Sequence, residues 1–455
     1  MNTSSSDRDT TQPSPQDHPF VRKPHRTVLF LAIPVLFSLI AEPLTGLVDT
    51  AFVAQLGNVS LSALGVGTTA LTSIFWIFNF LQIGTQTEVA RHIGRDEQQK
   101  ATQISGLALS LAVLFGVLII AITLPTLGLI ASAMGATGAV YDQAITYMQF
   151  RIFGAPAILL MLTAFGVLRG LQDMRTPLWV AVGVNMLNII LDPLFIFGWG
   201  ALPPLGVGGA ALASTLSQWV GAVWIVGVIV ARLGIPNRLQ FDEVGRLLQV
   251  GGDLFLRTGL LTLFLILGTR TATQIGPDAG GAHQAIRQFW VFAALFLDTF
   301  AITGQSLISY FLGAGWMAQA RRVATIICLW SLGTGVMLGL VMLVGQDIIA
   351  QFLVPTNSQS RFFSAWIVAA LIQPLNALTF ATDGIHWGTG DYGFLRNAMF
   401  AATIPCGLAL LLLDQHTPDA LVCVWVISGV WSMIRAFFGI VRIWPGWWGS
   451  PLAQT

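Results

Sequence analysis

The sequence predicts an all-α polytopic membrane protein, with twelve transmembrane helices in two six-helix lobes related by a pseudo-two-fold axis along the membrane normal. The first observation behind this prediction is composition: of 455 residues, 55% are hydrophobic and 9% are charged, and the mean hydropathy is +0.74. A soluble domain usually contains about 25% charged residues, so lipid suits this chain better than water. The other two observations are a series of long apolar segments and an internal repeat.

Twelve segments are long and apolar enough to cross a bilayer, which takes about 20 residues. Each is expected to be a helix, because lipid requires every backbone group to be hydrogen-bonded within the protein and the segments are too long for barrel strands. The segments are 28–54, 62–90, 102–124, 143–168, 177–199, 206–231, 247–274, 284–311, 323–344, 362–387, 395–413 and 419–441.

Basic residues indicate the orientation of these segments. With the N-terminus in the cytoplasm, 17 of the 22 lysines and arginines fall at cytoplasmic ends, which is the asymmetry that orients membrane proteins. The outer loops 57–60, 200–205 and 276–282 contain no lysine or arginine. Both termini are therefore expected in the cytoplasm, and Arg151 is expected at an outer helix end.

The spans divide the chain into five parts. We expect a disordered cytoplasmic tail at 1–24, because this stretch is rich in Ser, Thr, Gln and Pro. An amino-terminal lobe of six spans follows at 25–231, a cytoplasmic linker at 232–246 and a carboxy-terminal lobe of six spans at 247–443. Residues 444–455 form a second cytoplasmic tail.

The two halves resemble each other at a constant separation. "QLGNVSLSALGV" at 55–66 matches "QIGPDAGGAHQA" 219 residues later, and "GVLRGLQDMRTP" at 166–177 matches "GIHWGTGDYGFL" 218 residues later. Gly94 and Gly313 are also 219 residues apart. Both halves begin on the cytoplasmic side, so the repeat is parallel. Parallel repeats of this kind build transporters whose site lies between the halves and which work by alternating access.

Carboxylates within the apolar segments are the strongest functional signal. Such groups are costly in lipid and usually face the interior of a bundle or a water-filled cavity. Glu42 and Asp49 are seven residues apart, and Asn188 and Asp192 are four apart, so each pair shares a helix face. Oxygen ligands of this type suit Na⁺, and two close carboxylates also suit a shared proton. The alternative is that each Asp only hydrogen-bonds a neighbouring helix.

Charged and aromatic residues in the second half predict a substrate cavity. Asp298 is expected to pair with Arg257 or Arg270, either as a structural ion pair or as part of a cavity lined by both signs. The remaining candidates for this cavity are Asp383, His386 and Trp290. The alternative role of His386 is a helix–helix hydrogen bond. The alternative position of Trp290 is the lipid interface.

Several function classes find no support in the sequence. The net charge of +1 does not favour nucleic acid, and no phosphate-binding loop is present. The three cysteines have no metal or disulfide spacing. No HExxH or GxSxG motif appears, so we expect neither an enzyme nor a cofactor other than a coupling ion, H⁺ or Na⁺.

Four stretches resemble the multidrug and toxic compound extrusion (MATE) family, and in particular its DinF-like branch. They are "AEPLTGLVDTAFVAQLG", "LNIILDPLFIFG", "LGVGGAALASTLSQ" and the "GVLRGLQDMRTP" quoted above. The resemblance covers about residues 25 to 440. It implies two six-helix lobes, a central V-shaped cavity and a multi-pass protein of the bacterial inner membrane.

The resemblance also implies roles for individual residues. Asp49, Asp192 and Asn188 match the amino-lobe cation site, which is a metal site if the ion is Na⁺, and Glu42 matches a position that is acidic in plant-like members. Asp298 and Asp383 match the aspartates of "DG" motifs in spans eight and ten. Thr299 replaces the usual glycine of the first motif.

We therefore expect an antiporter that exports organic cations or drugs in exchange for H⁺ or Na⁺. An exporter of citrate-like organic anions is the alternative, and a flippase for lipid-linked precursors is a third possibility that twelve spans disfavour. The expected partners are a small organic substrate and the lipid bilayer, with the protein acting as a monomer.

Overall fold

The computed structural model describes residues 17–200, 202–236, 244–354 and 358–453. Within these ranges the chain is helical, and its only β feature is one isolated bridge. The predicted all-α class is confirmed. The long apolar runs explain it, because in lipid a helix satisfies its own backbone groups.

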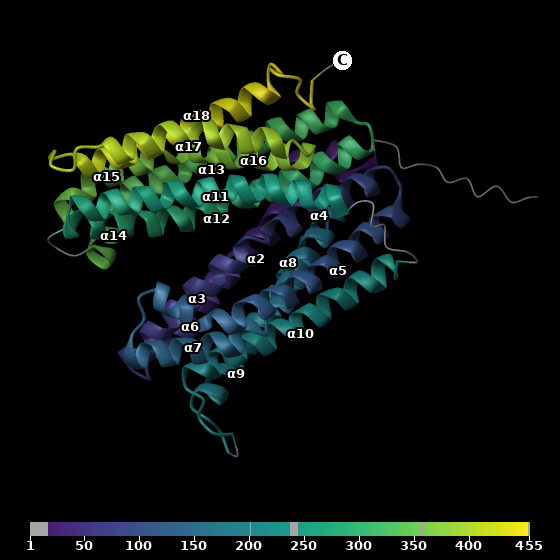
Figure 1. The fold of residues 1–455 in the computed structure, drawn as a ribbon. Coiled ribbons are helices and arrows are strands. Elements are labelled where there is room, and N and C mark those ends of the chain that lie inside the picture. Colours follow the sequence, from purple (N-terminus) through teal and green to yellow (C-terminus); the bar gives the residue numbers. More distant parts are fainter. Residues whose placement is uncertain (1–16, 201, 237–243, 355–357, 454–455) are drawn as a thin grey trace, which may run out of the picture.

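Two bundles of helices make up the molecule (Figure 1). After the short α1, Pro19–Arg22, the first bundle contains α2 Pro24–Ala54, α3 Asn58–Trp76, α4 Asn79–Gly94, α5 Gln98–Thr123, α6 Leu127–Ala133, α7 Gly138–Ile152, α8 Ala155–Gly170, α9 Arg175–Ile196 and α10 Val207–Leu233. The second contains α11 Val244–Ile275, α12 Pro277–Gly313, α13 Met317–Val344, α14 Gln346–Leu353, α15 Gln359–Leu371, α16 Gln373–Thr389, α17 Tyr392–Leu412 and α18 Ala420–Ile443.

These helices supply the expected number of membrane spans. In the described ranges, ten helical segments are long and apolar enough to cross a membrane, and there are twelve if each of two bent pairs is one span. The pair α7 and α8 is bent by 51°, and the pair α15 and α16 by 44°. Pro156 and Pro374 lie in the first turn after each break, where a missing N–H is tolerated.

The repeat predicted from the sequence is visible where the bundles meet. The Gln86 side chain on α4 donates from Nε2 to the carbonyl of Ile302 on α12 at 2.9 Å. Gln305 on α12 donates to the carbonyl of Ile83 on α4 at 2.8 Å. Each residue of one contact lies 219 positions from its counterpart in the other, so a pseudo-two-fold axis runs between α4 and α12.

Two glycines obey the same symmetry and bring these helices into close contact. A Cβ atom on Gly94 would lie 2.1 Å from the carbonyl oxygen of Tyr310, and one on Gly313 would lie 2.1 Å from that of Arg91. No side chain fits at such distances. The matching pair of glycines in the sequence is therefore explained by backbone contact between the bundles.

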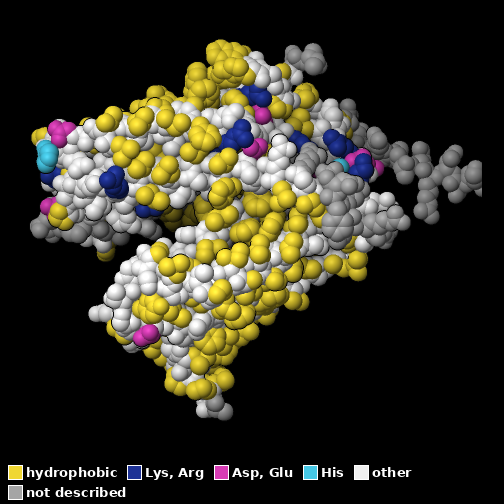
Figure 2. All heavy atoms as spheres, in the orientation of Figure 1, with side chains coloured by type: hydrophobic (Ala, Val, Ile, Leu, Met, Phe, Trp, Pro, Cys, Tyr) yellow, Lys and Arg dark blue, Asp and Glu magenta, His cyan; other side chains and the backbone are white. Residues whose placement is uncertain are grey.

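The bundles touch at one end and diverge at the other. Helices α4 and α8 of the first bundle pack against α12 of the second, and α4 also contacts α16. Figure 1 shows that α6, α7 and α9 lie far from α14 and α15 at the opposite end. Figure 2 shows the hollow that this arrangement leaves between the bundles.

The chain termini differ in part from expectation. Residues 1–16 of the predicted tail and 237–243 of the predicted linker lie outside the described residues. The described end of the tail is folded: Phe20 in α1 is fully buried, and its ring centroid lies 5.5 Å from that of Phe311. His18 adds a hydrogen-bond contact with Gln172 at 3.1 Å, so these two side chains anchor a segment whose composition predicted disorder.

Candidate ion and substrate sites

A cleft of about 220 Å³ opens within the first bundle, between α2, α3, α7, α9 and α10. Asp49 on α2 lines it and is 9% exposed, and Asp192 on α9 is fully buried beside it. The two carboxyl groups lie within hydrogen-bonding distance of each other. The structure therefore brings together the two aspartates that the sequence placed on separate helices.

Asn188 and Ser214 complete this group. Ser214 on α10 donates from Oγ to Asp49 at 3.4 Å, and the Asn188 amide nitrogen lies 3.4 Å from Asp192 Oδ1. With the amide turned over, its nitrogen donates to Asp49 at 2.9 Å and its oxygen accepts from the Ser214 N–H at 3.2 Å. The second orientation gives the shorter bonds. In either orientation Asp192 Oδ2 receives no hydrogen bond from an N–H or O–H donor of the described residues.

Arg151 also lines this cleft, although its position in the sequence predicted that it lies at an outer helix end. Its guanidinium donates to Gln218 Oε1 at 2.6 Å and hydrogen-bonds Tyr147, one turn earlier on α7. Its charge acts on Glu42 and Asp49, which line the same cleft. The signal available in the sequence was the spacing of Tyr147 and Arg151, four residues apart and therefore on one helix face.

In the second bundle Asp383 is held by two arginines. Its Oδ2 accepts from Arg257 and, at 2.7 Å, from Arg435, and all three side chains are buried. No ion pair of the described residues joins Asp298 to either predicted partner. Arg257 binds Asp383 and acts on Asp298 only through its charge, and Arg270 is exposed on α11. Nothing in the sequence indicated that Arg435, on the last helix, would reach this carboxylate.

Asp298 lies near cations of both bundles. The strongest of these charges is that of Arg169 on α8, which is 2% exposed, and that of Arg257 on α11 comes second. Arg169 Nη2 donates to Ser38 Oγ at 3.4 Å, whereas its Nε and Nη1 have no acceptor among the described residues. Asp298 and Arg169 therefore lie on opposite sides of the junction between the bundles.

Two other predicted cavity residues lie elsewhere. His386 is 1% exposed and its Nε2 contacts the Gly439 carbonyl on α18 at 3.2 Å, so it packs between α16 and α18. Trp290 lines a small pocket inside the second bundle. The six residues are thus spread over several places, and their shared role in one substrate cavity stays a prediction.

A larger cleft of about 530 Å³ lies between the two bundles. Its lining comes from α3 and α11 and is uncharged, with hydroxyl groups among apolar side chains. The lining residues are Thr69, Thr72, Ser73, Trp76, Ile77, Phe255, Thr258, Gly259, Thr262, Leu263 and Ile266. Its size and mostly apolar walls suit a drug-sized organic molecule.

Comparison with known proteins agrees with this architecture. Residues 34–194, which include Asp49 and Asp192, match the MatE family model. The chain is 28% identical to DNA damage-inducible protein F of Escherichia coli, over 96% of both chains. It is also 28% identical to Protein DETOXIFICATION 44, chloroplastic, of Arabidopsis thaliana, over 96% of this chain and 85% of that protein.

The fold is shared with solved MATE structures. One of them, described as MATE in the bent conformation, superposes with a TM-score of 0.85 at 21% identity and covers 92% of this chain and 94% of that one. The chain contains a MatE domain. It is a multi-pass membrane protein that shares the fold of MATE transporters over 92% of its length.

Proposed function

We propose that this protein is an antiporter of the MATE family, exporting organic cations or drugs in exchange for H⁺ or Na⁺. The observation that carries the proposal is the Asp49–Asp192 pair in the amino-lobe cleft. Two carboxyl groups this close either share a proton or hold a cation between them. Asn188 and Ser214 supply further oxygens for an ion.

The position of the pair links ion binding to conformation. Asp49 and Asp192 lie in the last two turns of α2 and α9, at the end where the bundles diverge in Figure 1. The ligands come from α2, α9 and α10, so filling the site pulls these helices together. An ion that binds one arrangement of the lobes more tightly than the other shifts the balance between them.

Transport by the purified protein in liposomes tests this proposal. A fluorescent organic cation is followed under an imposed H⁺ gradient and then under an imposed Na⁺ gradient. We expect one gradient to drive uptake and Asp49→Asn and Asp192→Asn each to abolish it. Asp347→Asn is the matched control, because Asp347 is exposed on α14. Full coupled transport by Asp49→Asn would contradict the proposal.

Export of an organic anion such as citrate is the second candidate. It is favoured by Arg151, which projects a positive charge into the same cleft as Glu42. The same liposomes tested with labelled citrate separate the two candidates. Citrate transport without transport of the organic cation would replace the first proposal by the second.

We also propose that both termini face the cytoplasm and that the bacterial inner membrane is the site of action. The distribution of lysines and arginines supports this orientation. Fusions of a phosphatase, active only outside, and of a fluorescent protein, fluorescent only inside, are to be made after residue 443 and within 200–205. We expect fluorescence from the first position and phosphatase activity from the second; the reverse pattern would overturn the orientation.

A further inference from the structure

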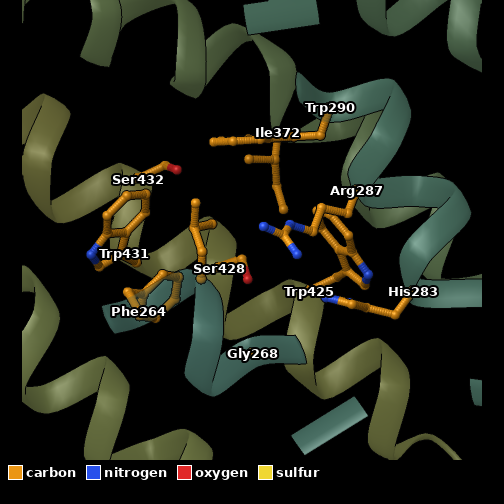
Figure 3. Close-up of a pocket in the computed structure, with 11 residues that line it drawn as sticks. Phe264, Gly268, His283, Arg287, Trp290, Ile372, Trp425, Ser428, Trp431 and Ser432 are labelled. Carbon is orange, nitrogen blue, oxygen red and sulfur yellow. The ribbon is translucent and has the colours of Figure 1, made fainter. Parts of the chain in front are cut away.

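A small cavity in the second bundle has no role in the proposed function. It measures about 30 Å³ and lies between α11, α12 and α18. Figure 3 shows the Arg287 guanidinium projecting into the space between Ile372, Ser428 and Trp425. Trp290 and other aromatic side chains form most of the remaining wall.

Arg287 has no carboxylate partner in the part of the chain that the structure describes. None of the ion pairs found there includes it, and its guanidinium makes one hydrogen bond, to Thr269 Oγ at 3.3 Å. It lies within α12, the helix of a membrane span. An unpaired cation is costly in such surroundings, so a counter-ion from solution is expected beside it.

A second donor in the same wall is also unused. The indole N–H of Trp425 has no acceptor among the described residues, although the residue is 5% exposed. The His283 ring, 5.5 Å from that of Trp425, packs beside the indole, and its Nε2 lies 3.4 Å from Thr269 Oγ. Buried donors without acceptors are rare in native proteins, and an anion in the cavity would satisfy this one.

The internal repeat shows that this cavity corresponds to the ion cleft of the first bundle. Six residues lining that cleft have counterparts in the cavity at separations of 218 or 219 positions. Among them, Asp49, Thr68, Leu71 and Ser214 correspond to Gly268, Arg287, Trp290 and Ser432. The aspartate is replaced by glycine and a threonine by arginine, so the same place in the second bundle has the opposite charge.

We propose that the cavity binds one small anion, either a halide ion or a single carboxylate group, through Arg287 and the Trp425 N–H. Its volume of about 30 Å³ has room for one group of this size and excludes a drug-sized molecule. The site is separate from the Asp49–Asp192 pair and does not depend on which substrate is exported.

Thermal unfolding of the purified full-length protein tests the site without transport. Chloride or acetate is added stepwise in place of a bulky sulfonate, so that the ionic strength stays constant. We expect a saturable rise in the unfolding temperature that Arg287→Gln removes and Arg270→Gln preserves, since Arg270 is an exposed arginine of the adjacent helix. A response to chloride alone identifies a halide site, and a response to both anions identifies a site that accepts a carboxylate.

Trp425→Phe keeps the aromatic wall and removes only the N–H donor. We expect it to weaken the apparent affinity for the anion by about tenfold, the usual effect of losing a hydrogen bond to a charged group. This variant decides the question if Arg287→Gln does not fold. The proposal is overturned if no anion gives a saturable shift, or if the folded variants respond like the wild type.

Discussion

At the residue scale, the amino-lobe cleft depends on contacts between side chains that are distant in the sequence. Asp49 and Asp192 meet although 143 positions separate them. Arg151 enters the same cleft from a third helix, where it hydrogen-bonds Gln218. A positive charge beside two acids weakens their attraction for a cation, so in the proposed antiporter Arg151 would favour release of the ion.

Asp173 is a residue outside the membrane whose protonation state affects stability. It lies in the loop between α8 and α9, where its carboxylate accepts from the N–H groups of Arg175 and Thr176, each at 3.0 Å, and pairs with Arg232 at 2.6 Å. Burial alone would raise its pKa, but the hydrogen bonds from Thr176, the charge of Arg232 and the N–H of Arg175 together lower it.

We predict that Asp173→Asn lowers stability near neutral pH by up to about 1 kcal/mol, because the amide can still cap α9 but loses the ion pair with Arg232. Since the folded state lowers the pKa, the stabilisation is present above the ordinary value of about 3.9 and is lost as the pH falls through the lowered value. Thermal unfolding of both proteins from pH 7 to pH 3 checks this, with exposed Asp142→Asn as the control. A difference that stays constant across this range would contradict the assignment.

At the element scale, the contact between α4 and α12 is set by two glycines. Gly313 leaves no room for a Cβ because the carbonyl of Arg91 would lie 2.1 Å from it. Gly333, in the middle of α13, has no atom within 4 Å of the same position. Replacement by alanine is therefore expected to have opposite effects on stability at these two positions.

We predict that Gly313→Ala lowers the unfolding temperature, because the helices must separate to admit the methyl group. Overpacking of this kind costs about 1–3 kcal/mol. Gly333→Ala is expected to be neutral or stabilising by up to about 1 kcal/mol, since alanine favours the helix. Thermal unfolding of the two variants beside the wild type measures both effects. Equal stability of the two variants would show that the close contact is not maintained in the membrane.

At the scale of the whole molecule, the reciprocal glutamines hold the bundles together at one end. Gln86 and Gln305 each donate to a backbone carbonyl of the other bundle, and Gln305 also reaches Thr87 Oγ at 2.9 Å. The proposed antiport by alternating access would require this end to open, and these bonds would then stabilise the arrangement seen here over its alternative.

We predict that Gln305→Ala favours opening of this end by about 0.5–1.5 kcal/mol, the usual net value of a neutral hydrogen bond. Amide hydrogen exchange should then be faster at the facing ends of α4 and α12. Gln274→Ala is the control, because Gln274 hydrogen-bonds Gln415 on the exposed surface, far from the junction. Unchanged exchange in Gln305→Ala would show that the glutamines do not control opening.

The sequence predicted the helical class, the number of spans and the repeat because each depends on local composition or on periodicity. Twelve apolar runs require helices in lipid, whatever their arrangement. The separation of 219 residues also paired Gly94 with Gly313, and the structure then showed that the two glycines make equivalent contacts. The sequence also identified Asp49, Asn188 and Asp192, because charges in an apolar run are conspicuous.

Only the tertiary structure decided which charges meet. Arg257 binds Asp383 with Arg435, Asp298 faces Arg169 across the junction, and Arg287 remains without a carboxylate among the described residues. Spacing along a helix determines which residues share its face, whereas the pairing of faces depends on how helices rotate and cross. That choice is made by packing over the whole molecule, and no local pattern in the sequence records it.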